Sequence, residues 1–234
     1  MTTAGEQPSF PGYDVVARAH AWDDVTRGVV LARLGPTPPL RFFSVEEEAA
    51  CRPLLDRLLA QDQPHVPVFE LIDARLSERE TDGWRHDDMP EDTDAWKQSL
   101  AALDQDAVAR HGCPFFNLGL DDQRNLLEAI RTGDDWYSLS APRVWNLWMR
   151  YACAAFYSHP WAWNEIGFGG PAYPVGYQNI GLDKREHWEV REANAENPEP
   201  WARRIERARQ LHRVPTSPSP PSSGSPGSSK SNRR

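Results

Sequence analysis

The chain has 234 residues, a formal net charge of −8 and 26% charged residues. This acidic balance argues against a nucleic-acid-binding protein, which needs a basic face to neutralise phosphate. No apolar run approaches the ~20 residues of a membrane span, and the first residues, MTTAGEQPSFPGYD, lack the basic and apolar regions of a signal peptide.

The first 60 residues predict a short lead-in followed by helices. Residues 1–12 are expected to be a flexible lead-in, and residues 13–34 one or two short helices. The first helical face is assigned to Trp22, Val25, Val29 and Val30. Ser44 and Glu47 have the spacing of a capping box, which should begin a helix that ends near Ala60. The apolar stripe of that helix is Val45, Cys51, Leu54, Leu55, Leu58 and Leu59.

The middle of the chain alternates helices with connectors. Pro67 suits the first turn of a helix with Val68, Leu71, Ile72 and Leu76 on one face. An acidic loop, residues 78–94, separates it from a helix over residues 93–110 that carries Trp96, Leu100 and Leu103 and stops at Gly112. Pro114, Phe115 and Phe116 are expected to form a buried connector, and Asp121 to cap a helix that closes at Gly133.

The last third begins with an apolar helix and continues into an aromatic loop. Residues 140–157 are apolar on more than one side, which predicts a central helix. The density of Gly and Pro in residues 156–188 leaves no helical or strand period, yet its many aromatic residues argue against disorder. We therefore expect a long ordered loop with Trp and Tyr anchors and Gly at turns and close approaches. Residues 183–193 are a candidate for a further helix.

These elements together predict a mainly α fold, an irregular helical bundle with a long ordered Trp/Tyr/Gly/Pro-rich loop and a disordered C-terminal tail. The expected organisation is a lead-in over 1–12, a helical domain over 13–193, a basic helix over 194–213 and a Ser/Pro-rich tail over 214–234. Three widely spaced cysteines without a C-x-x-C motif predict reduced structural thiols, with one disulfide as the alternative.

Three segments in order carry a family resemblance. They are Ser158-His159-Pro160 with Asn164 and residues 166–171 (IGFGGP); residues 83–90 (GWRHDDMP) with 94–96 and 100–104; and residues 41–44 leading into 54–62 and 66–68. This pattern resembles the gluconate 2-dehydrogenase subunit 3 family, across roughly residues 10–190. The resemblance implies a small subunit that holds no flavin itself and accompanies a flavin-dependent sugar or polyol dehydrogenase.

Two clusters offer chemistry of their own. His86, Asp87 and Asp88 could hold a cation, but neighbouring residues seldom converge on one ion, and a polar turn in which Arg85 pairs with Asp87 or Asp88 is the alternative. Ser158 and His159 resemble a nucleophile beside a base without the surrounding elbow motif. The alternative for this pair is structural: Ser158 ends a helix and His159 bonds a backbone carbonyl.

The sequence lacks the motifs of a resident redox cofactor. The glycines at 167, 169 and 170 have no strand-to-helix context for a flavin or dinucleotide, and no C-x-x-C-H motif would attach a haem. We expect no cofactor in this chain and FAD in its partner, as the resemblance implies.

The resulting hypothesis is a non-catalytic small subunit that binds, stabilises and helps mature a large flavoprotein oxidoreductase of the glucose–methanol–choline type, acting on sugars or glycosides. The expected contact residues are Trp84, Arg85, His159, Trp161, Trp163, Asn164, Phe168, Tyr173 and Tyr177. One alternative is a stand-alone metal-assisted enzyme that uses His86, Asp87, Asp88 and His159, and another is an adaptor unrelated to redox chemistry. The expected location is the cytoplasm, or export together with a signal-bearing partner.

Overall fold

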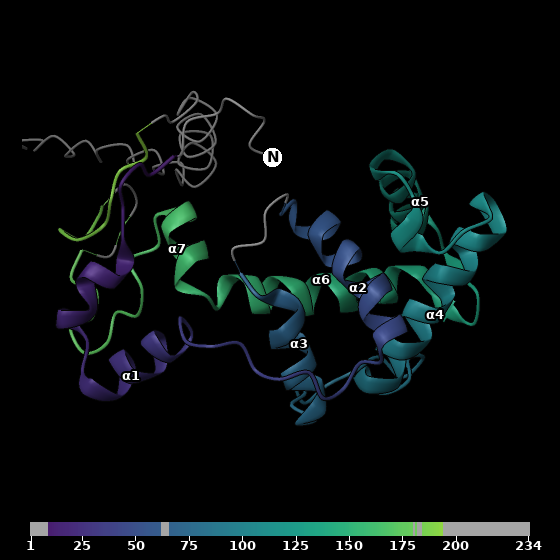
Figure 1. Cartoon of the computed structure of the whole chain (residues 1–234). Helices are drawn as coiled ribbons and strands as arrows, with labels where there is room; N and C mark the ends of the chain where they lie inside the picture. The colour runs from purple at the N-terminus through teal and green to yellow at the C-terminus, as the bar shows by residue number, and fades with distance from the viewer. Residues whose placement is uncertain (1–8, 62–65, 180, 182–183, 194–234) are drawn as a thin grey trace, which may run out of the picture. The chain divides into compact units, whose positions relative to one another are not determined.

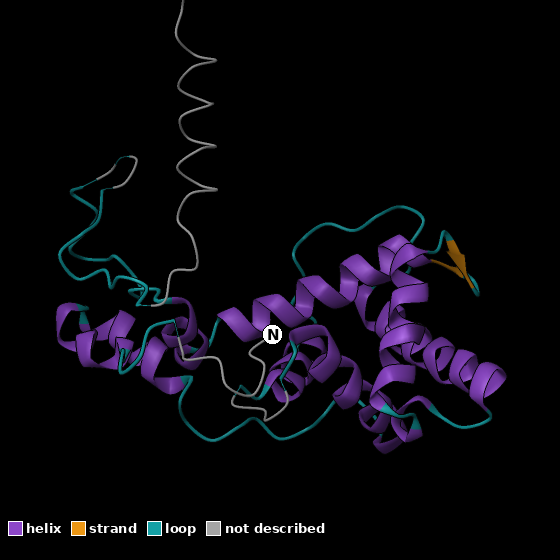
Figure 2. Cartoon of the chain, turned by 90° about the horizontal axis from the view of Figure 1, so that it is seen from above, coloured by secondary structure: helices purple, strands orange, loops and turns teal. Residues whose placement is uncertain are grey.

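The computed structural model describes residues 9–61, 66–179, 181 and 184–193, and they are mainly helical (Figures 1 and 2). The chain divides into two units, Met1–Asn194 and Ala195–Arg234, and the second lies outside the described residues. The predicted basic helix and Ser/Pro tail therefore lie outside them, as does most of the predicted lead-in. In the described part, no helix is long and apolar enough to cross a membrane.

The N-terminal elements are a 3₁₀ helix, η1 (Val15–Ala21), and the helix α1 (Asp24–Ala32). Asp14 and Asp23 cap them by accepting hydrogen bonds from the backbone amides of Val16 and Thr26. The predicted apolar face is only half correct. Trp22 and Val30 are buried, but Val25 and Val29 are exposed.

The helix α2 (Val45–Leu59) begins at the predicted capping box. Ser44 Oγ accepts the Glu47 amide hydrogen at 3.2 Å, and the Glu47 carboxylate accepts the Ser44 amide hydrogen at 2.8 Å. Five of the predicted stripe residues are buried or half-buried, whereas Val45 in the first turn is exposed. The helix ends at Ala60, which adopts the left-handed conformation with φ 52°.

Loss of this cap gives a modest, measurable effect. Replacing Ser44 by alanine is expected to lower the free energy of unfolding by about 1 kcal/mol, because the Glu47 amide loses its acceptor. Urea denaturation followed by circular dichroism measures this change. Ser138→Ala, at an exposed serine between the strands, serves as the control and should change stability by less than about 0.5 kcal/mol. Equal effects of the two substitutions would contradict the prediction.

The helices α3 (Val68–Ser77) and α4 (Asp92–His111) flank the loop over residues 78–91. Pro67 is the N-cap of α3 rather than its first residue. Gly112 ends α4 in the left-handed conformation, as predicted. The short 3₁₀ helix η2 (Phe115–Asn117) follows, and here the prediction was partly wrong, since Phe115 is buried but Phe116 is exposed.

The helix α5 (Leu120–Thr132) begins after Gly119, so the predicted cap at Asp121 was wrong: Asp121 lies in the first turn. Gly133 ends the helix as predicted. Two short antiparallel strands, β1 (Asp135–Trp136) and β2 (Leu139–Ser140), then lead into α6 (Ala141–Tyr157).

The helix α6 is central, as its all-round apolar character predicted. It packs against α2, α3, α4, α5 and α7 (Pro160–Ile166). Its buried residues Val144, Leu147, Trp148, Tyr151 and Ala152 join the main core with Trp96, Leu100 and Phe115. The three cysteines are free; Cys51 is buried in this core and Cys113 and Cys153 are half-buried.

A second, smaller cluster lies apart from the main core. It comprises the buried residues Val15, Trp22, Val30 and Trp163, with Tyr13, Val16 and Ala19 packed against them. We call it the satellite cluster. It joins the N-terminal elements η1 and α1 to α7, so residues 13–30 are held by the aromatic segment near the other end of the described chain.

Candidate functional site

The loop over residues 78–91, which carries the GWRHDDMP motif, is held against α6 by a shared carboxylate. Asp82 forms ion pairs with both Arg75 of α3 and Arg150 of α6. Burial alone would raise the pKa of Asp82, but the hydrogen bonds and charges of the two arginines outweigh it and lower this pKa. These two ion pairs therefore hold the loop against α3 and α6 at Asp82.

Arg150 also supports the aromatic residue of the motif. Its guanidinium carbon lies 5.0 Å from the centre of the Trp84 ring and 5.2 Å from that of Tyr151. These distances are typical of cation–π contacts. Trp84 is nevertheless 51% exposed. The ring is thus placed by Arg150 while much of it faces solvent.

Beneath the loop, the buried Asp92 at the start of α4 completes the network. Its Oδ2 accepts a hydrogen bond from the Tyr151 hydroxyl at 2.7 Å and one from Arg150 Nη2 at 3.1 Å. Burial, and then the hydrogen bond and charge of Asp92, raise the pKa of Tyr151, so its hydroxyl stays protonated and donates.

His86 and Asp88 lie beside Arg143 of α6. Arg143 Nη1 is 3.2 Å from His86 Nε2, and Arg143 Nε is 3.6 Å from the Asp88 carboxylate. The predicted pairing of Arg85 with Asp87 or Asp88 was therefore wrong, because an arginine of α6 faces this turn instead. Over the described residues, no group of three His, Cys, Asp or Glu side chains is arranged to hold a metal ion.

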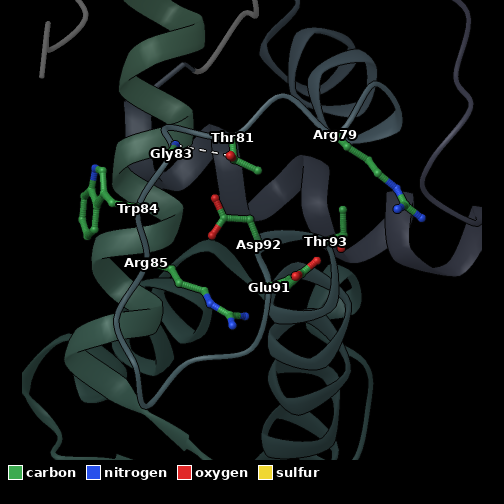
Figure 3. Close-up of a pocket in the computed structure, with 8 residues that line it drawn as sticks. All are labelled: Arg79, Thr81, Gly83, Trp84, Arg85, Glu91, Asp92 and Thr93. Atoms are coloured by element: carbon green, nitrogen blue, oxygen red, sulfur yellow. Dashed lines mark hydrogen bonds between the residues drawn. The ribbon is translucent and has the colours of Figure 1, made fainter.

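A pocket of about 370 Å³ opens between this loop and the start of α4 (Figure 3). Its lining includes two arginines, two carboxylates, two threonines and an aromatic residue: Arg79, Thr81, Gly83, Trp84, Arg85, Glu91, Asp92 and Thr93. Trp84 and Arg85, both expected contact residues, thus border one concave surface.

The aromatic segment after α6 differs from the predicted irregular loop, because it contains α7. His159 is the N-cap, Pro160 occupies the first helical position and Gly167 ends the helix with φ 66°. Proline is well tolerated at a first helical position, so here it starts a helix rather than breaking one. The candidate helix over 183–193 is absent from the described residues 184–193.

His159 and Ser158 have structural roles at this junction. Ser158 ends α6 as predicted, and its Oγ donates to the Ala155 carbonyl at 2.7 Å. Nδ1 of the buried His159 accepts from the Trp161 amide at 3.2 Å, whereas a carbonyl was expected as its partner. Burial lowers the pKa of His159, and a backbone hydrogen bond with Arg33 opposes this shift.

The glycines of the IGFGGP motif allow side chains of distant segments to approach the backbone, as predicted. A Cβ at Gly170, whose φ is 75°, would lie 2.6 Å from a ring carbon of Trp22. A Cβ at Gly169 would lie 2.7 Å from Arg18 Nη1. A side chain at Gly170 would therefore clash with the buried Trp22 ring of the satellite cluster, whereas at Gly169 the flexible end of Arg18 can move aside.

The expected contact residues fall into three groups. Trp84, Arg85, Phe168, Tyr173 and Tyr177 are exposed, Trp161 and Asn164 are half-buried, and His159 and Trp163 are buried. Asn164 Oδ1 accepts the Val15 amide hydrogen at 2.8 Å and so helps to tie η1 to α7. The exposed group supplies two accessible surfaces, one at Trp84 and one after α7.

The surface after α7 is braced by a buried carboxylate. Glu186 accepts hydrogen bonds from the amides of Gln178 and Asn179, each at 2.5 Å. Hydrogen bonding to Asn179, chiefly at its backbone, lowers the pKa of Glu186. These bonds order the stretch that carries Tyr177, in agreement with the predicted ordered loop. Sequence reasoning missed Glu186, Asp92 and Arg150, since no local motif marks them.

Comparison with known protein families identifies the part of the chain that carries these features. The model of the family described as gluconate 2-dehydrogenase subunit 3 matches residues 45–170. That range includes the loop over 78–91, the helices α2 to α7 and the glycines up to Gly170. No curated protein and no solved structure matched the chain.

Proposed function

The chain belongs to the gluconate 2-dehydrogenase subunit 3 family, accessory subunits of dehydrogenase complexes, and on that premise we propose that it binds, stabilises and helps to mature a large flavoprotein of the glucose–methanol–choline type. In this proposal the FAD and the oxidation of a sugar or glycoside belong to the partner. The accessory subunit contributes a binding surface, and the partner carries out the oxidation.

The observation that carries the proposal is the braced, exposed Trp84. Trp and Arg dominate the few residues that provide most of the binding energy at interfaces. Trp84 is held by Arg150, which in turn is held by Asp82 and Asp92, so little side-chain freedom remains to be lost on binding. Arg85 follows it on the same loop.

Stabilisation of the partner follows from mass action. A subunit that binds the folded flavoprotein and not its unfolded chain raises the partner's free energy of unfolding by RT ln(1 + [L]/Kd), about 2.7 kcal/mol at a concentration of 100 Kd. The same preference would favour the flavin-loaded, folded form during maturation.

Co-expression tests the proposal. The chain is tagged, produced together with the large flavoprotein encoded at its own locus, and purified through the tag, and the flavin absorbance of the product is measured. We expect flavin together with a second polypeptide, both lost when the partner is omitted. A pure chain without flavin or second polypeptide under conditions where the flavoprotein is soluble would refute the proposal.

A further inference from the structure

The pocket beside Trp84 is lined by two arginines, and neither of them pairs with a carboxylate in the described part of the chain. Arg75, Arg143 and Arg150, the other arginines around this loop, all form ion pairs within the chain. Within the described residues, no ion pair or hydrogen bond involves the side chain of Arg79 or Arg85. Asp92 does not neutralise them, because its carboxylate is occupied by Arg150 and Tyr151.

Arg79 occupies a position that the backbone would favour as glycine. Its φ is 53°, and it follows the C-cap of α3, where the Arg79 amide bonds the Leu76 carbonyl and the Glu80 amide bonds the Arg75 carbonyl. This pattern is the Schellman motif, in which the left-handed residue is most often Gly. A long cationic side chain at such a position costs stability in the isolated chain, which is consistent with a use for that side chain outside the fold.

The two arginines border the pocket at different depths. In Figure 3 the Arg85 side chain extends into the space between the loop and the start of α4, whereas Arg79 reaches outward at the rim. Glu91 lies near Arg85 in this view but forms no ion pair with it. The pocket therefore combines an inner cation, an outer cation and an exposed aromatic ring.

From this arrangement we infer that the pocket receives an acidic segment of the partner subunit, with one carboxylate beside Arg85 and a second at Arg79. Guanidinium groups bind carboxylates through paired, charge-assisted hydrogen bonds, and Trp84, next to Arg85 on the side away from Arg79, offers an apolar surface to a neighbouring residue of the segment. The inference rests on the proposed function and specifies its interface. Arg79 and Arg85 supply the positive charge for this contact, within a loop whose other charged residues are acidic.

The test measures the Kd of the intact chain for the co-expressed flavoprotein with single variants. Arg85→Gln and Arg79→Gly are each expected to weaken binding about tenfold, the usual loss for a charge-assisted contact. Arg79→Gly should leave the urea midpoint of the isolated chain unchanged or higher. Glu91→Gln should tighten binding severalfold, because it removes a negative charge in the pocket lining that would repel the incoming carboxylate.

Two matched controls separate these effects from general ones. Ala60→Gly makes the same glycine change at another left-handed position, φ 52°, away from the pocket. Arg124→Gln removes a positive charge from the surface of α5, where Arg124 pairs with the exposed Asp121 at 3.6 Å. Both controls should bind like the wild type. Raising the salt concentration should weaken binding of the wild type more than that of the Arg79/Arg85 double variant.

The outcomes of this experiment separate a failure of the acidic-segment inference from a failure of the proposed accessory function. If the wild type binds the flavoprotein and the arginine variants bind equally well, the acidic-segment inference is wrong while the accessory function stands. If the wild type binds no flavoprotein, both fail. If millimolar citrate saturates the isolated chain in a calorimetric titration and Arg85→Gln abolishes that binding, the pocket holds a free carboxylate ligand rather than a partner segment.

Discussion

Replacing Trp163 by alanine is expected to detach the N-terminal elements while leaving the main core folded. Trp163 is 5% exposed, and its Nε1 donates to the Tyr157 carbonyl at 2.6 Å. It is the residue through which α7 contributes to the satellite cluster. Truncation of a buried Trp typically costs about 3–5 kcal/mol. A cluster of four buried residues has little else to offset such a loss.

Hydrogen exchange measures this effect segment by segment. The amides of α1 should lose most of their protection in Trp163→Ala, while those of α4 should keep theirs. Phe168→Ala is the matched control, because the Phe168 ring packs in a T-shaped arrangement with Trp163, with ring centroids 5.5 Å apart, but is itself exposed. Phe168→Ala should lower the free energy of unfolding by less than about 1.5 kcal/mol. Unchanged protection of α1 in Trp163→Ala would show that the satellite cluster does not hold the N-terminal elements.

This expectation revises the interpretation of the aromatic segment. From the sequence, Trp161 and Trp163 were both expected to contact the partner subunit. The structure separates them, since Trp161 is half-buried beside the main core and Trp163 is buried in the satellite cluster. The first role of Trp163 is therefore to stabilise the fold. Any loss of assembly in the Trp163→Ala variant would partly follow from displacement of the N-terminal elements.

The helix boundaries that could be predicted are those set by local chemistry. The capping box at Ser44, the left-handed Gly112 and the Ser140-Ala141-Pro142 start each depend on neighbours within four residues. The helix α7 was missed because Pro160 and Gly167 were counted as breakers. Their actual positions, first residue and C-cap, are the ones that a short helix favours.

What the sequence could not predict depends on pairing across long separations. Asp73 is fully buried, and the cost of burying its carboxylate is offset by hydrogen bonds from the amides of residues 41–43, some thirty positions earlier. Arg150 meets Asp82 and Asp92 from a helix about sixty positions later. Val25 and Val29 of α1 and Val45 of α2 are likewise exposed, although the apolar spacing assigned them to buried faces.

Replacing Asp92 by alanine should destabilise the fold by about 3 kcal/mol, because it removes the carboxylate from a buried ion pair and hydrogen bond. Tyr151 and Arg150 would each lose an acceptor. This loss of unfolding free energy is at the lower end of the range for breaking a buried ion pair, because Arg150 keeps its ion pair with Asp82. Asp92→Asn, which retains an acceptor oxygen for Tyr151, should cost less.

Asp94→Ala is the matched control in the same first turn of α4. Asp94 is exposed, so its loss removes only its favourable interaction with the helix dipole, worth about 0.3–1 kcal/mol. Urea denaturation followed by circular dichroism compares the two variants. Equal losses for Asp92→Ala and Asp94→Ala would mean that the buried network contributes nothing beyond the interaction of an acidic side chain with the helix dipole.

The same variant links stability to the proposed interface. With Asp92 absent, Arg150 has one anchor instead of two, and the Trp84 ring that stacks on it should become more mobile. Binding to the flavoprotein should therefore weaken in Asp92→Ala even at temperatures where the chain remains folded. Asp94→Ala should bind like the wild type. A folded Asp92→Ala variant with unchanged affinity would show that bracing of Trp84 is dispensable, and the binding energy would then have to come from the surface after α7.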